Sequence, residues 1–172
     1  PSISASGSNI HITWRDERDG NNEIYYKRST DGGVSWGADT RLTNNSAFSF
    51  NPSVAASDSV VHVVWFDDRD GNFEIYYNKS ADEGTSWDAD TRLTNNSAAS
   101  NTSSLSVSGS FVNLVWEDNR DANSEIYYKR STDGGTNWEE DTRLTNNINS
   151  STAPSISGSG SSVHVVWNDN RD

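Results

Sequence analysis

The chain has 172 residues, a length typical of one domain, and its 25 acidic and 13 basic side chains give a formal net charge of −12. This charge argues against binding to nucleic acids or to acidic membrane surfaces, because both are polyanions. The absence of cysteine excludes disulfides and thiolate metal sites. No apolar run approaches the roughly 20 residues of a membrane helix, so no membrane insertion is expected.

An internal repeat with a period of 51 residues organises the chain. One tryptophan recurs at the same place in each copy, without insertion or deletion: Trp14, Trp65, Trp116 and Trp167. The copies span residues 1–51, 52–102, 103–153 and, for a partial fourth copy, 154–172. A repeat of this length is typically one supersecondary unit that stacks on its neighbours. We therefore expect a single domain, or part of one, built from these repeats.

Each repeat predicts four strands. In the first repeat they are expected at residues 2–6, 9–14, 23–29 and 36–43. No segment shows the apolar stripe of a helix. Four strands in about 50 residues, repeated, are typical of a β-propeller blade. The fold class is thus predicted to be all-β, a propeller with about three and a half blades, each a four-stranded antiparallel sheet.

The second repeat shows the signals most clearly, in chain order. Pro52 to Ser57 opens on a proline, which suits a strand start. Val60 to Trp65 is nearly continuous in apolar residues, as expected for a strand covered on both faces. Glu74 to Lys79 is β-branched and aromatic, and Trp87 to Thr94 is a more polar fourth strand. The change from apolar strands to a polar fourth strand places the apolar strands inside and the fourth strand at the outer edge of the blade.

The turn between the third and fourth predicted strands has one pattern in every full repeat. It reads STDGGVSW at residues 29–36, SADEGTSW at 80–87 and STDGGTNW at 131–138. This pattern resembles the Asp box, Ser-x-Asp-x-Gly-x-Thr-Trp, of the sialidase (BNR repeat) superfamily. The text W-x-D-x-R-D followed by E-I-Y-Y also resembles sialidase-like secreted bacterial proteins. The resemblance implies a propeller from a secreted or cell-surface protein, bacterial in origin.

The residues of this turn have structural roles in prospect. Asp31 is expected to accept backbone N–H groups across the turn, Gly33 to adopt a positive φ, and Trp36 to pack inward between strands. The resemblance places the turn on the face away from the active site. We therefore assign a structural role to Ser29, Asp31, Gly33, Trp36, Ser80, Asp82, Gly84, Trp87, Ser131, Asp133, Gly135 and Trp138.

The resemblance also implies catalytic equipment: three arginines that grip a carboxylate, a tyrosine nucleophile polarised by a glutamate, and an aspartate acid/base. The Arg-Ile-Pro segment of the first arginine is absent, since none of the three prolines follows Arg-Ile. Glu23 and Tyr25 lie two apart and share a strand face, yet the pair recurs in the next two repeats. A nucleophile belongs to one asymmetric site, so no catalytic residue is nominated.

One strand position alternates between histidine and asparagine. It holds His11, His62, Asn113 and His164 in successive repeats. Such a position is typical of a hydrogen-bonding residue in a core or channel. A metal-ligand role is the alternative, but no second ligand lies at a suitable spacing.

The loop after the second strand is the candidate ligand surface. Strand alternation places it opposite the Asp-box turn, and the resemblance implies that this is the side that faces a ligand. The Thr43-Asn44-Asn45 connection is expected on the same side. Arginine binds carboxylates through two donors, and mixed donors and acceptors suit ligands rich in hydroxyls. The candidate ligand-binding residues are Arg18, Arg69, Arg120, Arg171, Asp19, Asp70 and Asp121. The alternatives are an internal network of ion pairs and a Ca²⁺ site, although the spacing does not match an EF-hand loop.

The sequence therefore predicts a non-catalytic propeller module that recognises a glycan or a protein. A fragment of a sialidase-like glycoside hydrolase and a purely structural blade array are the alternatives. No cofactor is expected, with Ca²⁺ as the exception to test. Because propellers avoid open edges by closing their ring, further blades of a longer chain or a second chain are expected as partners.

Overall fold

The computed structural model describes residues 1–170, which form strands and loops and no helix. The first sheet contains β1 (Ser2–Ser6), β2 (Asn9–Asp16), β3 (Glu23–Ser29) and β4 (Thr40–Arg41). The second contains β5 (Ser49–Ser57), β6 (Val60–Asp67), β7 (Glu74–Ser80) and β8 (Thr91–Arg92). The third contains β9 (Ser100–Ser108), β10 (Phe111–Asp118), β11 (Glu125–Ser131) and β12 (Thr142–Arg143). A pair, β13 (Ser151–Ser159) and β14 (Ser162–Asp169), follows.

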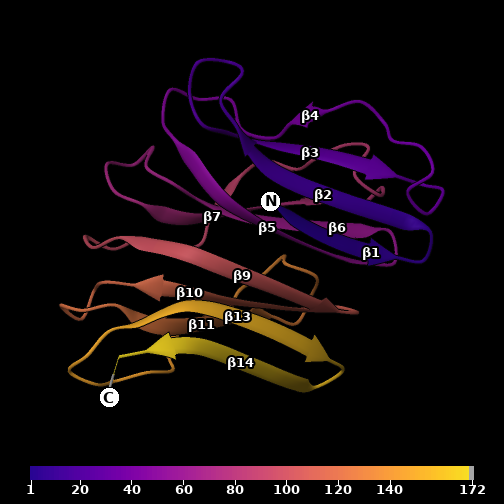
Figure 1. Ribbon diagram of the computed structural model, residues 1–172. Helices are drawn as coiled ribbons and strands as arrows, with labels where there is room; N and C mark the ends of the chain where they lie inside the picture. The colour runs from indigo at the N-terminus through magenta and orange to yellow at the C-terminus, as the bar shows by residue number, and fades with distance from the viewer. Residues whose placement is uncertain (171–172) are drawn as a thin grey trace.

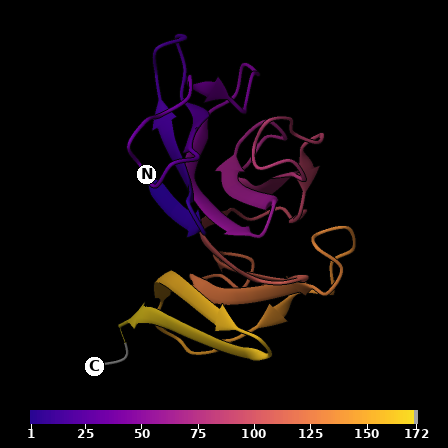
Figure 2. The same cartoon turned by 90° about the vertical axis from the view of Figure 1, so that its right-hand side faces the viewer.

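Each sheet is an antiparallel meander in which neighbours in sequence are neighbours in space. The orders are β1-β2-β3-β4, β5-β6-β7-β8 and β9-β10-β11-β12, with β13-β14 as a two-stranded sheet. Figure 1 shows the sheets stacked with their long strands side by side, and Figure 2 shows them fanned around a common centre. This is the arrangement of propeller blades, as the repeat predicts. The described residues include no helix that could cross a membrane.

The outermost strand of each blade is shorter than the sequence predicts. Only Thr40–Arg41 forms a strand in the first blade, where residues 36–43 are expected. The preceding residues belong to the turn, and a single backbone bond from Gly37 N to Arg28 O, 2.9 Å, joins them to β3. The predicted fourth strand at 87–94 is likewise reduced to Thr91–Arg92.

The innermost strand starts earlier than its proline. β5 begins at Ser49, and a register shift between Phe50 and Ser53 accommodates Pro52. Asn51 has a φ of 46° at this bulge. A proline cannot donate to the ladder, and a bulge removes that demand. The expectation that Pro52 opens the strand is therefore wrong.

The hydrophobic core lies between adjacent blades. Ile24 and Tyr26 of the first blade pack with Val63 and Trp65 of the second, and the second and third blades repeat this interface. Trp65 and Trp116 are fully buried, whereas Trp14 and Trp167 are half-buried. The difference has a geometric cause, because only a blade with a described neighbour on each side has both faces covered.

Serines connect the innermost strands of successive blades. Ser2 Oγ accepts a hydrogen bond from Val54 N at 3.1 Å, and Ser53 Oγ accepts one from Leu105 N at 3.1 Å. Ser106 Oγ does the same for Gly158 N at 2.8 Å. The polar alternation of the first strand therefore provides contacts between blades, which sequence reasoning did not recognise.

Candidate functional site

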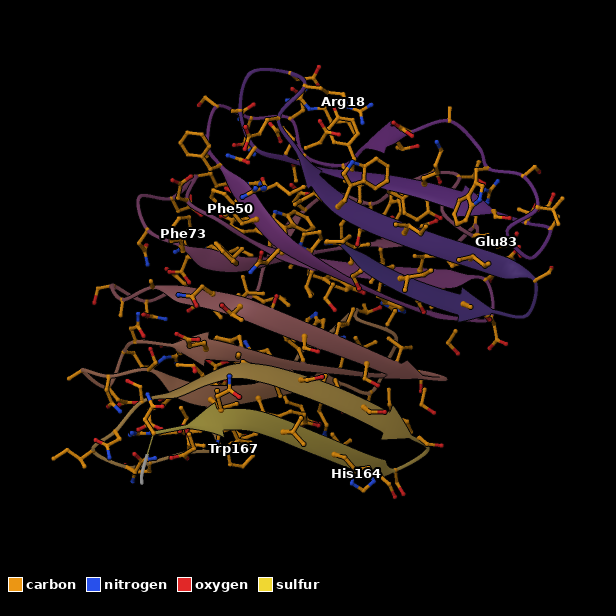
Figure 3. All side chains as sticks on the ribbon, in the orientation of Figure 1. Arg18, Phe50, Phe73, Glu83, His164 and Trp167 are labelled. Atoms are coloured by element: carbon orange, nitrogen blue, oxygen red, sulfur yellow. The ribbon has the colours of Figure 1, made fainter. Side chains whose placement is uncertain are left out.

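The two ends of the blades carry different loops. At one end, Gly32 of the turn after β3 donates to Ser8 O of the β1–β2 hairpin at 2.9 Å. At the other end, Asn21 Nδ2 donates to Asn45 O at 2.9 Å and to Ala47 O at 2.7 Å. We name this second end the loop face. It comprises the loops 17–22, 68–73 and 119–124 and the connections 43–48, 94–99 and 145–150. In Figure 3, Arg18, Phe50 and Phe73 lie toward this end and Glu83 toward the other.

The candidate arginines of the loop face are held by carboxylates of their own blade. Arg69 donates from Nε and Nη2 to Asp67, at 2.9 and 2.7 Å, and from Nη1 to Asp90 at 2.8 Å. Arg120 makes the matching contacts with its own blade, and Arg18 pairs with Asp16 and Asp39. These contacts are those of the ion-pair alternative. Arg171 lies outside the described residues.

These ion pairs change the acidity of the buried carboxylate. Burial of Asp67 opposes ionisation, but hydrogen bonds from Arg69, Ser49 Oγ and the Arg69 backbone outweigh it, so the pKa of Asp67 is lowered. Burial opposes ionisation of Arg69 too, but its hydrogen bonds to Asp67 and Asp90 outweigh that cost and raise the pKa of Arg69. Both groups are therefore charged at neutral pH, and the positive charge of the guanidinium is balanced by the carboxylates around it.

Each candidate aspartate accepts a hydrogen bond from a tyrosine of the third strand. Tyr25 Oη donates to Asp19, and Arg41 Nη1 lies 3.1 Å from the same carboxylate. The guanidinium of Arg18 lies over the Tyr25 ring, 4.5 Å from its centroid, in a cation–π contact. Asp70 and Asp121 have the equivalent tyrosine and arginine partners.

The glutamate two residues before this tyrosine is buried and serves another purpose. Glu23 is fully buried; it accepts a hydrogen bond from Thr43 Oγ1 and one from Arg41 Nη2 at 2.7 Å. Neither contact involves the Tyr25 hydroxyl, so the pair sharing a strand face is not a hydrogen-bonded pair. Glu74 and Glu125 repeat the arrangement.

The tyrosine hydroxyls are made less acidic by their surroundings. The hydrogen bond to Asp19 raises the pKa of Tyr25, with burial as the next cause. Burial and then the hydrogen bond to Asp121 raise the pKa of Tyr127 to about 12. A phenol acting as a nucleophile needs an accessible phenolate, and a raised pKa works against it.

The serine–aspartate turns at the opposite end are closed by their own side chains. Asp31 Oδ1 accepts from Ser35 N at 2.9 Å and from Ser29 Oγ at 2.7 Å, and Gly33 N donates to Ser29 Oγ at 2.9 Å. Hydrogen bonds from Ser35 and Ser29 lower the pKa of Asp31 to about 2. Gly33 has a φ of 90°, as expected from the sequence. Ser80, Asp82, Gly84, Ser131, Asp133 and Gly135 make the equivalent contacts.

The tryptophan of this turn packs against the preceding blade rather than inside its own. The Trp87 ring lies 4.9 Å from that of Tyr26, edge to face, and Trp138 lies 5.2 Å from Tyr77 in the same way. Trp36 has no such tyrosine beside it and is 39% exposed. The expected inward packing of Trp36 is therefore wrong, because the position belongs to the interface between blades.

The histidine position provides hydrogen bonds within the core. His11 and His62 each place Nδ1 at 2.7 Å from the hydroxyl of a tyrosine on the next strand, Tyr26 and Tyr77. Residues 1–170 contain no group of three or more His, Asp or Glu side chains arranged to hold a metal ion. His164, at the matching place on β14, is exposed.

A cluster of four phenylalanines, in the loops of the loop face and at the adjoining ends of β5 and β6, escaped the sequence analysis. Their ring centroids are 6.2 Å apart for Phe48 and Phe50, 5.5 Å for Phe50 and Phe66, and 5.0 Å for Phe66 and Phe73. Phe48 precedes β5, Phe50 lies on β5, Phe66 on β6 and Phe73 in the loop 68–73, so no periodic pattern connects them. The sequence signal that could have revealed them is that the equivalent positions of the other repeats hold no phenylalanine.

The comparisons with known proteins concern structure alone. No family model matches the chain, and no curated protein matches its sequence. The NanB sialidase of Streptococcus pneumoniae is 17% identical, with a TM-score of 0.55, over 79% of this chain and 21% of that one. These findings show a sialidase-like β-propeller fold.

Two further solved structures share this fold. The GH93 α-L-arabinofuranosidase of Fusarium graminearum is 15% identical, with a TM-score of 0.65, over 93% of this chain and 53% of its own. The Trypanosoma rangeli sialidase is 12% identical, with a TM-score of 0.60, over 99% of this chain and 36% of its own. The sialidase-like propeller described here thus spans about a fifth to a half of these proteins.

Proposed function

We propose that this sialidase-like propeller is a non-catalytic module that recognises carbohydrate, in a secreted or surface protein of a bacterium. Two features support the proposal. The fold is shared with glycoside hydrolases that act on sialosides and arabinofuranosides. The loop face carries carboxylates, amides and hydroxyls in a shallow hollow, which suits a ligand rich in hydroxyls. The turns of residues 29–36, 80–87 and 131–138 are, in this proposal, Asp boxes that hold the blades.

One observation carries the non-catalytic part. In all three complete blades, the glutamate is buried on an arginine and a threonine, while the tyrosine donates to an aspartate instead. Three identical arrangements, each with its hydrogen bonds made inside its own blade, are expected of groups that stabilise the blade. A reacting group needs one asymmetric site and an open hydrogen-bonding position.

The test is an assay of the 172-residue chain with fluorogenic sialosides and arabinofuranosides, beside binding to a glycan array. We expect binding without measurable hydrolysis. Turnover that disappears in Tyr25→Phe or Tyr76→Phe would contradict the proposal. The proposal includes no cofactor, and repeating the array with EDTA tests the calcium alternative.

A sialidase-like hydrolase is the second candidate, favoured by the hydrolases that share the fold and by the 21% of the NanB chain that this chain covers. In that case other blades supply the catalytic groups. Flanking sequence with an Arg-Ile-Pro segment and a Tyr–Glu pair that occurs once would support it. Activity in a longer polypeptide, absent from residues 1–172, separates the two candidates.

A further inference from the structure

The loop face contains positions at which the repeats diverge, whereas the blade framework barely changes. Phe48, Phe50, Phe66 and Phe73 gather where the 43–48 connection and the loop 68–73 meet the ends of β5 and β6. The corresponding residues one repeat later are Ala99, Asn101, Glu117 and Ser124. If the blade needed this cluster for its own stability, the cluster would recur with the repeat. The cluster does not recur, so its role is specific to this one place.

The cluster presents one ring to solvent. Phe50, Phe66 and Phe73 are half-buried against one another, and Phe48 is 44% exposed at the end of the row. The Arg15 guanidinium lies 5.5 Å from the Phe50 centroid on the other side. Phe48 is thus an exposed ring that leans on a row of half-buried rings behind it.

A hollow of about 400 Å³ opens beside this ring. Its walls are Phe48, the 45–47 connection, and Asp68, Arg69 and Gly71 of the next loop. Phe48 N donates to Asp68 Oδ1 at 2.8 Å, which ties the two walls together. No other side chain or backbone donor among residues 1–170 contacts the Asp68 carboxylate, so Oδ2 can accept from a ligand. An ionised carboxylate is purely an acceptor.

The charges of the hollow select against an anion. Arg69 is its cation, and three of its hydrogen bonds already go to Asp67 and Asp90. Asp68 adds a negative charge that no cationic side chain among residues 1–170 pairs with. An anionic sugar would meet repulsion from Asp68 and find no free guanidinium, whereas a neutral sugar meets neither obstacle.

We propose that this hollow binds a neutral sugar ring, stacked on Phe48 through its C–H groups, with a hydroxyl donating to Asp68. The face of an aromatic ring is electronegative and attracts the polarised C–H groups of a sugar. The proposal rests on the carbohydrate recognition proposed above and names its site and ligand class.

The experiment uses the 172-residue chain on an array of neutral pentose and hexose oligosaccharides, each hexose glycan printed beside its sialylated form, with lactose and sialyllactose as one pair. The variants are Phe48→Ala and Asp68→Asn. Phe111→Ala is the matched control, because Phe111 is 38% exposed and lies beside the β9–β10 hairpin at the opposite end. Circular dichroism and the unfolding midpoint verify that each variant is folded.

We expect neutral glycans to bind and both site variants to lose at least about tenfold in affinity, as for a contact at the centre of a binding site. Phe111→Ala should bind as the wild type does. Unchanged binding in folded Phe48→Ala overturns the site but leaves carbohydrate recognition standing, and preference for the sialylated partner overturns the neutral ligand. If no glycan binds, the proposed function falls as well.

Discussion

A single position shows how the framework tolerates two side chains. His62 Nδ1 lies 2.7 Å from Tyr77 Oη, and in the next blade Tyr128 Oη donates to Asn113 Oδ1 at the same 2.7 Å. Each side chain is a small polar partner for the tyrosine on the next strand. The histidine alone titrates in an accessible range, and burial, then the charge of Lys79, lower the pKa of His62 to about 4.

The His62→Asn variant should therefore lose less stability in acid. The folded state holds His62 neutral down to about pH 4, while the unfolded chain takes up the proton near pH 6.5, so stability falls across this window as the pH falls. At pH 4.5 the wild type should have lost about 2–3 kcal/mol more than the variant, relative to pH 7. Urea unfolding at both pH values measures this.

The control is His164→Asn, which changes the exposed residue at the matching place on β14. It should leave the difference between the two pH values as in the wild type. If His62→Asn loses as much stability as the wild type, burial of the neutral ring does not govern the pH dependence.

At the level of elements, the serine–aspartate turn of one blade completes the interface with the blade before it. Trp87 packs on Tyr26, and Tyr26 Oη donates to Glu83 O at 3.3 Å. A Cβ at Gly84 would lie 1.9 Å from Tyr26 Oη. Gly84 thus has two reasons to be glycine, its φ of 84° and the tyrosine pressed against it.

Gly84→Ala should consequently destabilise the protein more than Gly33→Ala. Gly33 has a similar φ of 90°, but a Cβ there meets Ile10 Cδ1 at an ordinary 3.4 Å. Backbone strain alone should cost about 1 kcal/mol, and displacement of the tyrosine about 1–3 kcal/mol more. Denaturant unfolding of both variants provides the comparison. Equal losses would show that the tyrosine yields without cost.

For the whole molecule, blade faces without a described neighbour are apolar. Val166 on β14 is 66% exposed, although Val64 and Val115 at the same place in the repeat are fully buried. Trp36 and Ile3 are exposed at the first blade, at 39% and 66%. Burial of each such face in the interior interfaces indicates that these faces favour contact with another blade.

A polypeptide limited to residues 1–172 should therefore self-associate at micromolar concentration, because it carries no further blades to cover these faces. Sedimentation velocity measures the association, and Val166→Glu should weaken it because a carboxylate would replace an apolar contact. A monodisperse wild-type monomer would contradict the expectation. Thr30→Glu, on an exposed turn residue, is the charge-matched control and should associate as the wild type does.

The sequence alone determined the repeat, the four strands of each blade and the propeller class. These follow from local signals, since Trp65 and the apolar run around it recur every 51 residues and the turn residues mark the hairpins. It also located Asp31 and Gly33 correctly within their turn, because an Asx-type turn is closed by neighbours in sequence. The length of the fourth strand was overestimated, because the turn takes up its first residues.

Only the tertiary structure decided what the side chains contact across blades. Trp36 and Trp87 have the same sequence environment, yet burial depends on a tyrosine about 60 residues away. The same holds for Arg69, whose hydrogen bonds reach Asp90 in another part of the blade, and for Phe48, whose supporting rings come from β5, β6 and the loop 68–73. Periodicity reports which face a residue occupies, but packing between sheets decides which partner stands opposite.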